Sequence, residues 1–168
     1  MDAHIVALRL GVAFLLGGLL GLERELRGQS AGLRTHLLVS LGSCLFTLAS
    51  IYAAQPLVDD VPVGTRADIT RIASQVVVGI GFLGGGAILR HGDSIRGLTT
   101  AANLWLTASI GLAAGLGFLH GAAITGGLAL LVLAGLRPVE HFLARVRRKR
   151  HIARDGDTTS EKPPESQG

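Results

Sequence analysis

Long stretches without a charged side chain constrain this sequence of 168 residues more than any other feature. Four of them approach the length of a membrane-spanning helix: residues 3–22, 37–54, 72–89 and 98–119. The first is interrupted only by His4 and Arg9. A fifth, residues 121–136, reaches that length as 118–136 if His120 lies at the membrane interface. Because a helix needs about 20 apolar residues to cross a hydrocarbon core about 30 Å thick, the sequence predicts an all-α, polytopic membrane bundle with five transmembrane helices.

A water-soluble bundle of five buried helices is the first alternative. Its helices would need polar outer faces, but only 17% of the residues are charged, against roughly a quarter in an average soluble domain. A cleaved signal peptide is the alternative for the first stretch. Asp2 precedes it without a Lys or Arg, and no small-x-small cleavage motif lies before the cluster at Glu23, so a retained helix is favoured.

The distribution of Lys and Arg predicts the orientation of the bundle. Five helices place residues 23–36, residues 90–97 and the C-terminal segment on one side, which carries thirteen of the sixteen Lys and Arg residues. The opposite side carries only Arg66 and Arg71, with Asp59, Asp60 and Asp68 beside them. The positive-inside rule therefore places the N-terminus outside and the C-terminus in the cytoplasm.

Three regions are expected along the chain. Residues 1–136 form the transmembrane domain, residues 137–154 a basic juxtamembrane segment and residues 155–168 a disordered polar tail. The basic segment suits anionic lipid headgroups, and nucleic acid is not expected as a partner. The longest loop, residues 55–71, includes Asp68, which is expected to begin the third helix. The single cysteine, Cys44, excludes a disulfide within the chain.

Glycine and alanine are expected to bring the helices together. Pairs with small-xxx-small spacing allow close backbone approach in membranes, and they occur at Gly17/Gly21, Gly81/Gly85, Ala113/Gly117 and Ala122/Gly126. They favour a compact bundle with one face free for self-association. The segment GIGFLGGG at residues 79–86 satisfies G-x-G-x-x-G, but no βαβ unit or correctly spaced acidic residue accompanies it. The segment is instead predicted to be a closely packed helix or, alternatively, a locally unwound one that lines a transport site.

Polar side chains inside the predicted helices suggest further contacts. Thr99, Asn103 and Thr107 recur at i, i+4 and i+8 on the fourth helix, which predicts one stripe that bonds to neighbouring helices or, alternatively, lines a pathway. Trp105 is a candidate core residue. Arg9 lies within the first helix, and Asp68 on the same predicted side is its candidate partner.

The acidic residues at the cytoplasmic end favour ion pairing. Glu23 and Glu25 flank Arg24, and more arginines follow. A Mg²⁺ site built on these carboxylates is the less favoured alternative. The sequence contains no evident nucleophile, base and orienter set and no His or Cys cluster at metal spacing, so we expect no enzymatic activity and no cofactor.

Three blocks of sequence resemble one known family. Residues 21–36 read GLERELRGQSAGLRTH, residues 67–89 read ADITRIASQVVVGIGFLGGGAIL, and residues 97–105 read GLTTAANLW, with IGLAAGLG at 110–117. In this order they resemble the membrane domain of the MgtC/SapB family of bacterial inner-membrane proteins, over about residues 3–136. The residues that match the family's motifs are the functional candidates: Glu23, Arg24, Arg34, Thr35, His36, Asp68, Arg71, Gly79, Gly81, Gly84, Thr99, Thr100, Asn103 and Trp105.

The resemblance implies a role in adaptation to low magnesium or stress and, in pathogens, in survival inside host cells. It implies a non-enzymatic protein that modulates other membrane proteins, the F-type ATP synthase among them. The alternative is an oligomeric small permease for Mg²⁺ or another cation. The expected partners are membrane lipids and further copies of the chain or another inner-membrane complex. The chain is similar to short, SapB- or YhiD-like members that lack a cytoplasmic ACT-like domain, and Gly85 departs from the alanine common in the family.

Overall fold

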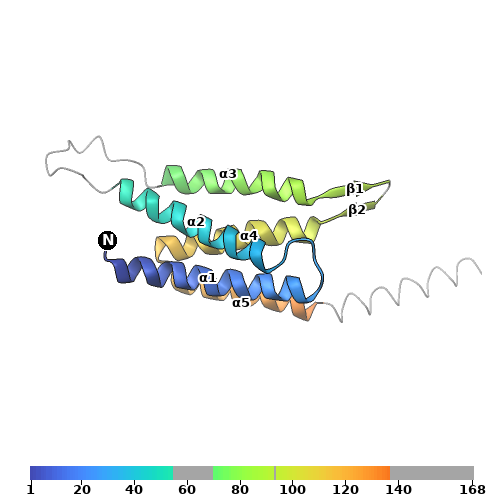
Figure 1. The fold of residues 1–168 in the computed structure, drawn as a ribbon, viewed down its shortest axis with the longest axis horizontal. Helices are drawn as coiled ribbons and strands as arrows, with labels where there is room; N and C mark the ends of the chain where they lie inside the picture. The colour runs from blue at the N-terminus through green and yellow to red at the C-terminus, as the bar shows by residue number, and fades with distance from the viewer. Residues whose placement is uncertain (55–69, 93, 137–168) are drawn as a thin grey trace, which may run out of the picture. The chain divides into compact units, whose positions relative to one another are not determined.

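The computed structural model describes residues 1–54, 70–92 and 94–136, and it is mostly helical as the sequence predicts. Five helices occur in the described residues: α1 (Ala3–Leu26), α2 (Leu33–Ala53), α3 (Thr70–Ala87), α4 (Leu98–Leu116) and α5 (Leu119–Gly135). A short hairpin, β1 (Leu89–His91) and β2 (Ser94–Arg96), joins α3 to α4 (Figure 1). The chain divides into two compact units, residues 1–130 and 131–168. The contacts below lie within the first unit.

Small residues on α1 and α4 allow these helices to pack closely against α2. A Cβ atom added at Gly17 of α1 would lie 2.6 Å from Cβ of Ser40. One added at Gly115 of α4 would lie 2.7 Å from Cβ of Thr47, and one at Gly111 would collide with the backbone carbonyl of Ser40. Helix α2, which has no glycine pair at small-xxx-small spacing, therefore packs between glycines of α1 and α4. The expected close approach at Gly17/Gly21 is confirmed.

The glycine-rich segment of α3 differs from both expectations. Residues 79–86 form continuous helix, so the segment is not unwound. An added Cβ atom at Gly79, Gly81, Gly85 or Gly86 would meet nothing within 4 Å in the described residues, and only the one at Gly84 would touch Ala101. The prediction of close packing through this segment is therefore wrong for the described chain, because only Gly84 of these glycines lies against a neighbouring helix.

Two helix boundaries lie beyond the limits that the charge-free runs suggested. Helix α1 continues through the charged residues to Leu26, because Glu23 and Arg27 pair at i and i+4. The chain then turns at Gly28, whose φ is 61°. Helix α2 begins at Leu33, whose amide donates to Glu25 Oε2 at 3.0 Å. The charged residues at the ends of these two runs therefore lie inside the helices and do not mark their limits.

The hairpin between α3 and α4 was not predicted. It pairs Leu89 with Arg96, Arg90 with Ile95 and His91 with Ser94. Gly92 occupies the turn with φ 56°. The sequence does contain the signal, because Gly92-Asp93 between two short segments is the dipeptide of a two-residue hairpin.

Two described helices, α1 and α2, are long and apolar enough to cross a membrane by length and composition. Core helices of soluble proteins can satisfy the same criterion. The predictions for residues 55–69, including a helix start at Asp68, and for the basic segment and polar tail lie outside the described residues.

Candidate functional site

A cluster of buried polar side chains lies between α1, α2 and α4. Its members come from two of the sequence blocks, residues 21–36 and 97–105: Arg24, His36, Thr100 and Asn103. We call these four residues the polar cluster. They lie near the end of α1, the beginning of α2 and the beginning of α4, which the fold brings to the same end of the first unit (Figure 1). Four of the candidate residues from the sequence are therefore brought together.

His36 of the polar cluster has both ring nitrogens bonded. Nδ1 lies 2.8 Å from the carbonyl oxygen of Gly32, and Nε2 lies 2.8 Å from Nδ2 of Asn103. A carbonyl oxygen only accepts, so Nδ1 carries the hydrogen and Nε2 accepts from the Asn103 amide. The arrangement therefore satisfies a neutral imidazole and joins the first turn of α2 to α4.

Arg24 of the polar cluster lies on the inner face of α1. Its Nη2 donates to Oε1 of Gln29 at 2.8 Å and to Oγ1 of Thr100 at 3.4 Å. The side chain points inward because Leu20 and Gly17, one and two turns earlier, are buried on the same helical face. The guanidinium group thus ties the end of α1 to the first turn of α4.

The carboxylates beside the cluster have local partners. Glu23, whose side chain is only 10% exposed, forms an ion pair with Arg27. Glu25 accepts from the Leu33 amide at the beginning of α2. The expectation of ion pairing here is confirmed for Glu23. Among the described residues, no three His, Cys, Asp or Glu side chains converge as a metal site.

The polar stripe of α4 differs from the predicted one. Thr100, Asn103 and Thr107 are buried, whereas Thr99 is exposed. Successive side chains on a helix point about 100° apart. The face of α4 that carries Gly111 and Gly115 therefore includes Thr100 and not Thr99. Trp105 is 49% exposed and is not a core residue.

Hydroxyl groups deeper in the bundle bond to backbone carbonyls. Thr107 Oγ1 donates to the carbonyl of Asn103, and Thr47 Oγ1 donates to that of Ser43, each at 2.8 Å. Ser40 Oγ donates across helices to the carbonyl of Ala13 at 2.8 Å. Sequence reasoning missed Gln29, Ser40 and Thr47. Ser40, Ser43 and Thr47 recur at i, i+3 and i+7, and this spacing could have indicated one buried face of α2.

Arg9 has a partner that the sequence did not indicate. Its Nη1 donates to the carbonyl oxygen of Gly115 at 2.7 Å. Helix α4 ends one residue later, at Leu116, and Gly117 follows in the left-handed conformation. The last carbonyls of a helix lack helical partners and carry partial negative charge, so Arg9 caps α4 from within α1. The predicted partner, Asp68, lies outside the described residues.

The remaining candidates are dispersed. Arg34, Thr35 and Arg71 are exposed, as are Gly79 and Gly81, while Gly84 is buried against α4. The polar cluster itself is equipped to hold three helices together. Its side chains bond to one another, to the Gln29 side chain and to the carbonyl of Gly32.

Comparisons with known proteins place these features in a family. The sequence profile described as the MgtC family matches residues 10–142. Protein MgtC of Brucella abortus is 43% identical over 141 residues, 84% of this chain and 55% of that protein. The Escherichia coli K12 protein named "Putative magnesium transporter YhiD" is 44% identical over 133 residues, 79% of this chain and 60% of that protein.

A third relative, the protein slr0014 of Synechocystis, is 43% identical over 143 residues, 85% of this chain and 57% of that protein. The chain thus spans little more than half the length of the curated relatives it matches. No solved structure matches it.

Proposed function

Because the chain belongs to the MgtC family, we propose that it is a multi-pass protein of the bacterial inner membrane whose five helices all cross the bilayer. The observation that carries this proposal is an inverted distribution of polarity. His36, Ser40, Thr47 and Thr107 are among the most buried side chains. Phe82, in contrast, is 85% exposed and Leu26 is 79% exposed. Buried polar side chains and exposed apolar ones both raise the free energy of a fold in water, whereas a hydrocarbon solvent favours both.

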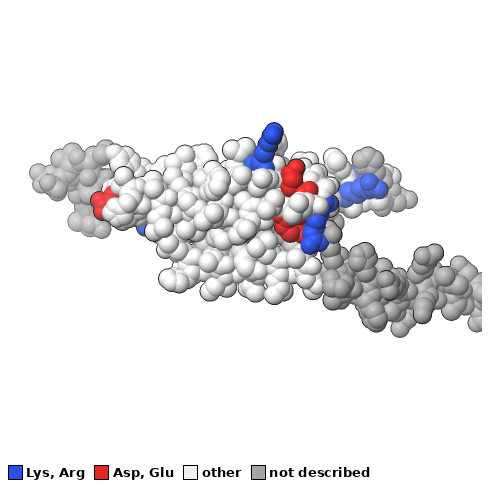
Figure 2. Space-filling view, turned by 60° about the horizontal axis from the view of Figure 1, so that its bottom comes forward, with Lys and Arg blue, Asp and Glu red and all other residues white. Residues whose placement is uncertain are grey.

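The surface charge supports the same location. Figure 2 shows charged side chains gathered towards two ends of the described surface, with a broad uncharged belt between them. A belt without charge is what a hydrocarbon layer about 30 Å thick requires.

The polar side chains of α4 are compatible with a membrane crossing. Thr100, Asn103 and Thr107 lower its average hydropathy, but all three are buried against protein. Lipid therefore meets its other side chains, such as Trp105 and Leu116, which are exposed.

The proposed orientation puts the N-terminus outside and the C-terminus in the cytoplasm. The α1–α2 connection and the β1–β2 hairpin lie at the same end of the first unit, and both carry arginines. The positive-inside rule assigns that end to the cytoplasm. Reporter fusions after Gln29, Asp60 and Gly92 test this orientation. Alkaline phosphatase should be active only at Asp60, and activity at Gly92 would reverse the assignment.

For the biochemical role, we propose a non-enzymatic regulator that binds other membrane proteins during adaptation to low magnesium. Support comes from the polar cluster, whose bonds join helices, and from Gly81 and Gly85 of α3, which have open space around an added Cβ atom. Such glycines allow the backbone of a neighbouring helix to approach closely. The F-type ATP synthase is among the candidate partners that the family resemblance suggests.

Site-specific photo-crosslinking in cells tests the regulator proposal. A photoreactive residue in place of Phe82 on α3 should yield a heterologous membrane complex under low magnesium. Ile124 on α5, which is also exposed, is the matched control position and should yield less of it. Crosslinks at Phe82 to copies of the same chain alone would contradict the proposal.

A cation permease is the second candidate, favoured by the name of the YhiD relative. Reconstituted vesicles should then show Mg²⁺ flux that Asn103→Leu or Asp68→Asn abolishes, while Trp105→Leu preserves it. Absence of flux from correctly folded protein would remove this candidate.

A further inference from the structure

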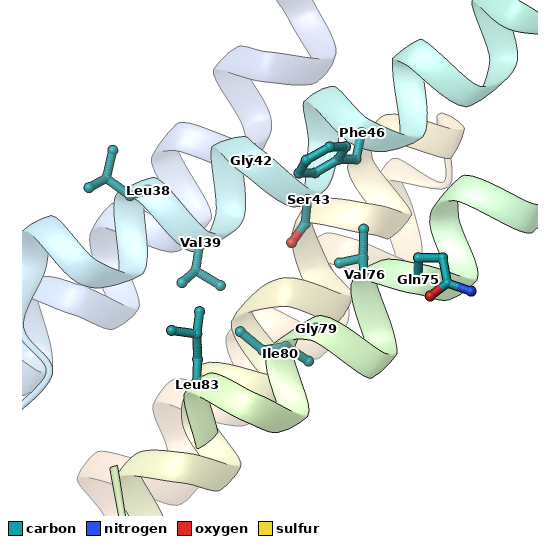
Figure 3. A pocket seen from close by; sticks show the side chains of 10 residues that line it. All are labelled: Leu38, Val39, Gly42, Ser43, Phe46, Gln75, Val76, Gly79, Ile80 and Leu83. Carbon is teal, nitrogen blue, oxygen red and sulfur yellow. The ribbon is translucent and has the colours of Figure 1, made fainter. Parts of the chain in front are cut away.

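A groove runs between α2 and α3 (Figure 3). Figure 3 shows side chains of both helices lining it, among them Val39 and Phe46 from α2 and Val76 and Ile80 from α3. This hollow has a volume of about 540 Å³. A second hollow of about 440 Å³ shares Val39 and Leu83 with the first and continues to Leu89 in β1. The two hollows together form what we call the α2–α3 groove.

The dimensions of the groove fit a hydrocarbon chain. Its α3 lining extends from Gln75 to Ala87, about 18 Å at 1.5 Å per residue. One leaflet of a bilayer core is about 15 Å thick. An acyl chain of one leaflet therefore matches the length of the groove.

The chemistry of the groove changes towards the β1–β2 hairpin. Ser30 and Thr35 line the second hollow. Arg34 is exposed one helical turn before Leu38, a lining residue. Arg96 is also exposed and is the cross-strand partner of Leu89, so both lie on one face of the hairpin. Each arginine thus adjoins a residue that lines the second hollow, because Arg34 precedes Thr35 and Arg96 pairs with Leu89.

We propose that the α2–α3 groove binds one anionic phospholipid, with an acyl chain between the helices and its phosphate at Arg34 and Arg96. The inference rests on the proposed membrane location, which puts this end at the cytoplasmic leaflet. That leaflet carries the anionic lipids that juxtamembrane arginines attract. Glu25, the carboxylate that precedes α2, is engaged by the Leu33 amide.

Native mass spectrometry of the full chain tests the proposal. The detergent-solubilised protein is mixed with equal amounts of phosphatidylglycerol and phosphatidylcholine. We expect one phosphatidylglycerol to remain bound in roughly tenfold preference or more, because each arginine near an anionic group contributes about fivefold. Equal retention of the two lipids would overturn the proposal.

Substitutions separate the headgroup from the acyl chain. Arg34→Gln combined with Arg96→Gln should remove the preference for phosphatidylglycerol but preserve lipid binding. Gly79→Leu should displace both lipids, because Gly79 lines the groove and has free space around it. Gly11→Leu is the matched control, since Gly11 also has nothing within 4 Å but lies on α1. Unchanged retention in Gly79→Leu, checked with Gly42→Leu on the opposite wall, would overturn the proposal.

Two further outcomes distinguish this inference from the proposed function. If alkaline carbonate extracts the chain from membranes, the membrane location fails and the lipid site fails with it. If the chain stays in the membrane but retains no lipid selectively, only the lipid site fails. A change from dimer to monomer in Gly79→Leu without lipid loss would identify the groove as a contact between copies and would also overturn the proposal.

Discussion

The side chains of His36 and Asn103 are joined by a hydrogen bond of 2.8 Å, although 67 positions separate them in the chain. The bond connects α2 to α4. About one turn earlier on α4, Thr100 accepts from Arg24, which connects α1 to α4. Three helices thus share one polar junction, and each lost donor leaves a buried acceptor without its partner. This relationship makes the junction testable by substitution.

Replacement of Asn103 should weaken the contact between α2 and α4. We expect Asn103→Leu to lower the free energy of unfolding by about 1–2 kcal/mol, because hydrogen bonds between membrane helices contribute up to about that much. Denaturant titration in detergent measures the effect. A cycle with His36→Phe should show coupling, and strictly additive losses would contradict the direct bond.

Glycine substitutions should separate packed from open positions. Gly111→Ala should lower the free energy of unfolding by about 1–3 kcal/mol, because its Cβ atom would collide with the Ser40 carbonyl. Gly81→Ala on α3 is the matched control, with free space around its Cβ atom. It should leave stability unchanged or raise it by up to about 1 kcal/mol, since alanine is the better helix former. Equal losses at both positions would refute the assigned packing.

We expect Arg9 to stabilise the fold through its hydrogen bond to the end of α4, and not through its charge alone. Arg9→Met removes the donor to the Gly115 carbonyl and should cost about 1.5–3 kcal/mol, the range for bonds to charged groups. Arg71→Met is the control, because Arg71 is exposed on α3. Thermal unfolding in detergent compares the two variants. A larger loss for Arg71→Met would argue against the cap.

Two glycines of the hairpin region should respond differently to asparagine. Both Gly92 and Gly97 have positive φ, at 56° and 89°, and asparagine is among the residues that adopt the left-handed region. Gly92→Asn should be tolerated, because an added Cβ atom meets nothing within 4 Å. Gly97→Asn should destabilise the start of α4 by about 1–3 kcal/mol, since its Cβ atom would collide with the Ala87 backbone. Limited proteolysis at the hairpin reports the difference, and equal cleavage of the two variants would contradict it.

The helices were predictable because each hydrophobic run is a continuous stretch of the sequence. Residues 3–22 and 37–54 lie almost wholly within α1 and α2, since a stretch without charge has few alternatives to a helix in an apolar solvent. The ion pairing of Glu23 was also predictable, because its partner Arg27 lies about one helical turn away.

The partners of individual residues depended on the tertiary structure. Sequence spacing alone did not distinguish Thr99 from Thr100, because that choice depends on which face of α4 packs against α2 through Gly111 and Gly115. The same limit applies to Arg9, whose acceptor lies 106 residues away. The charge-free runs of the sequence thus determined which segments form helices. Only the packing of one helix on another decided which polar groups meet and which glycines of α3 stay open, because those contacts join residues that are remote in sequence.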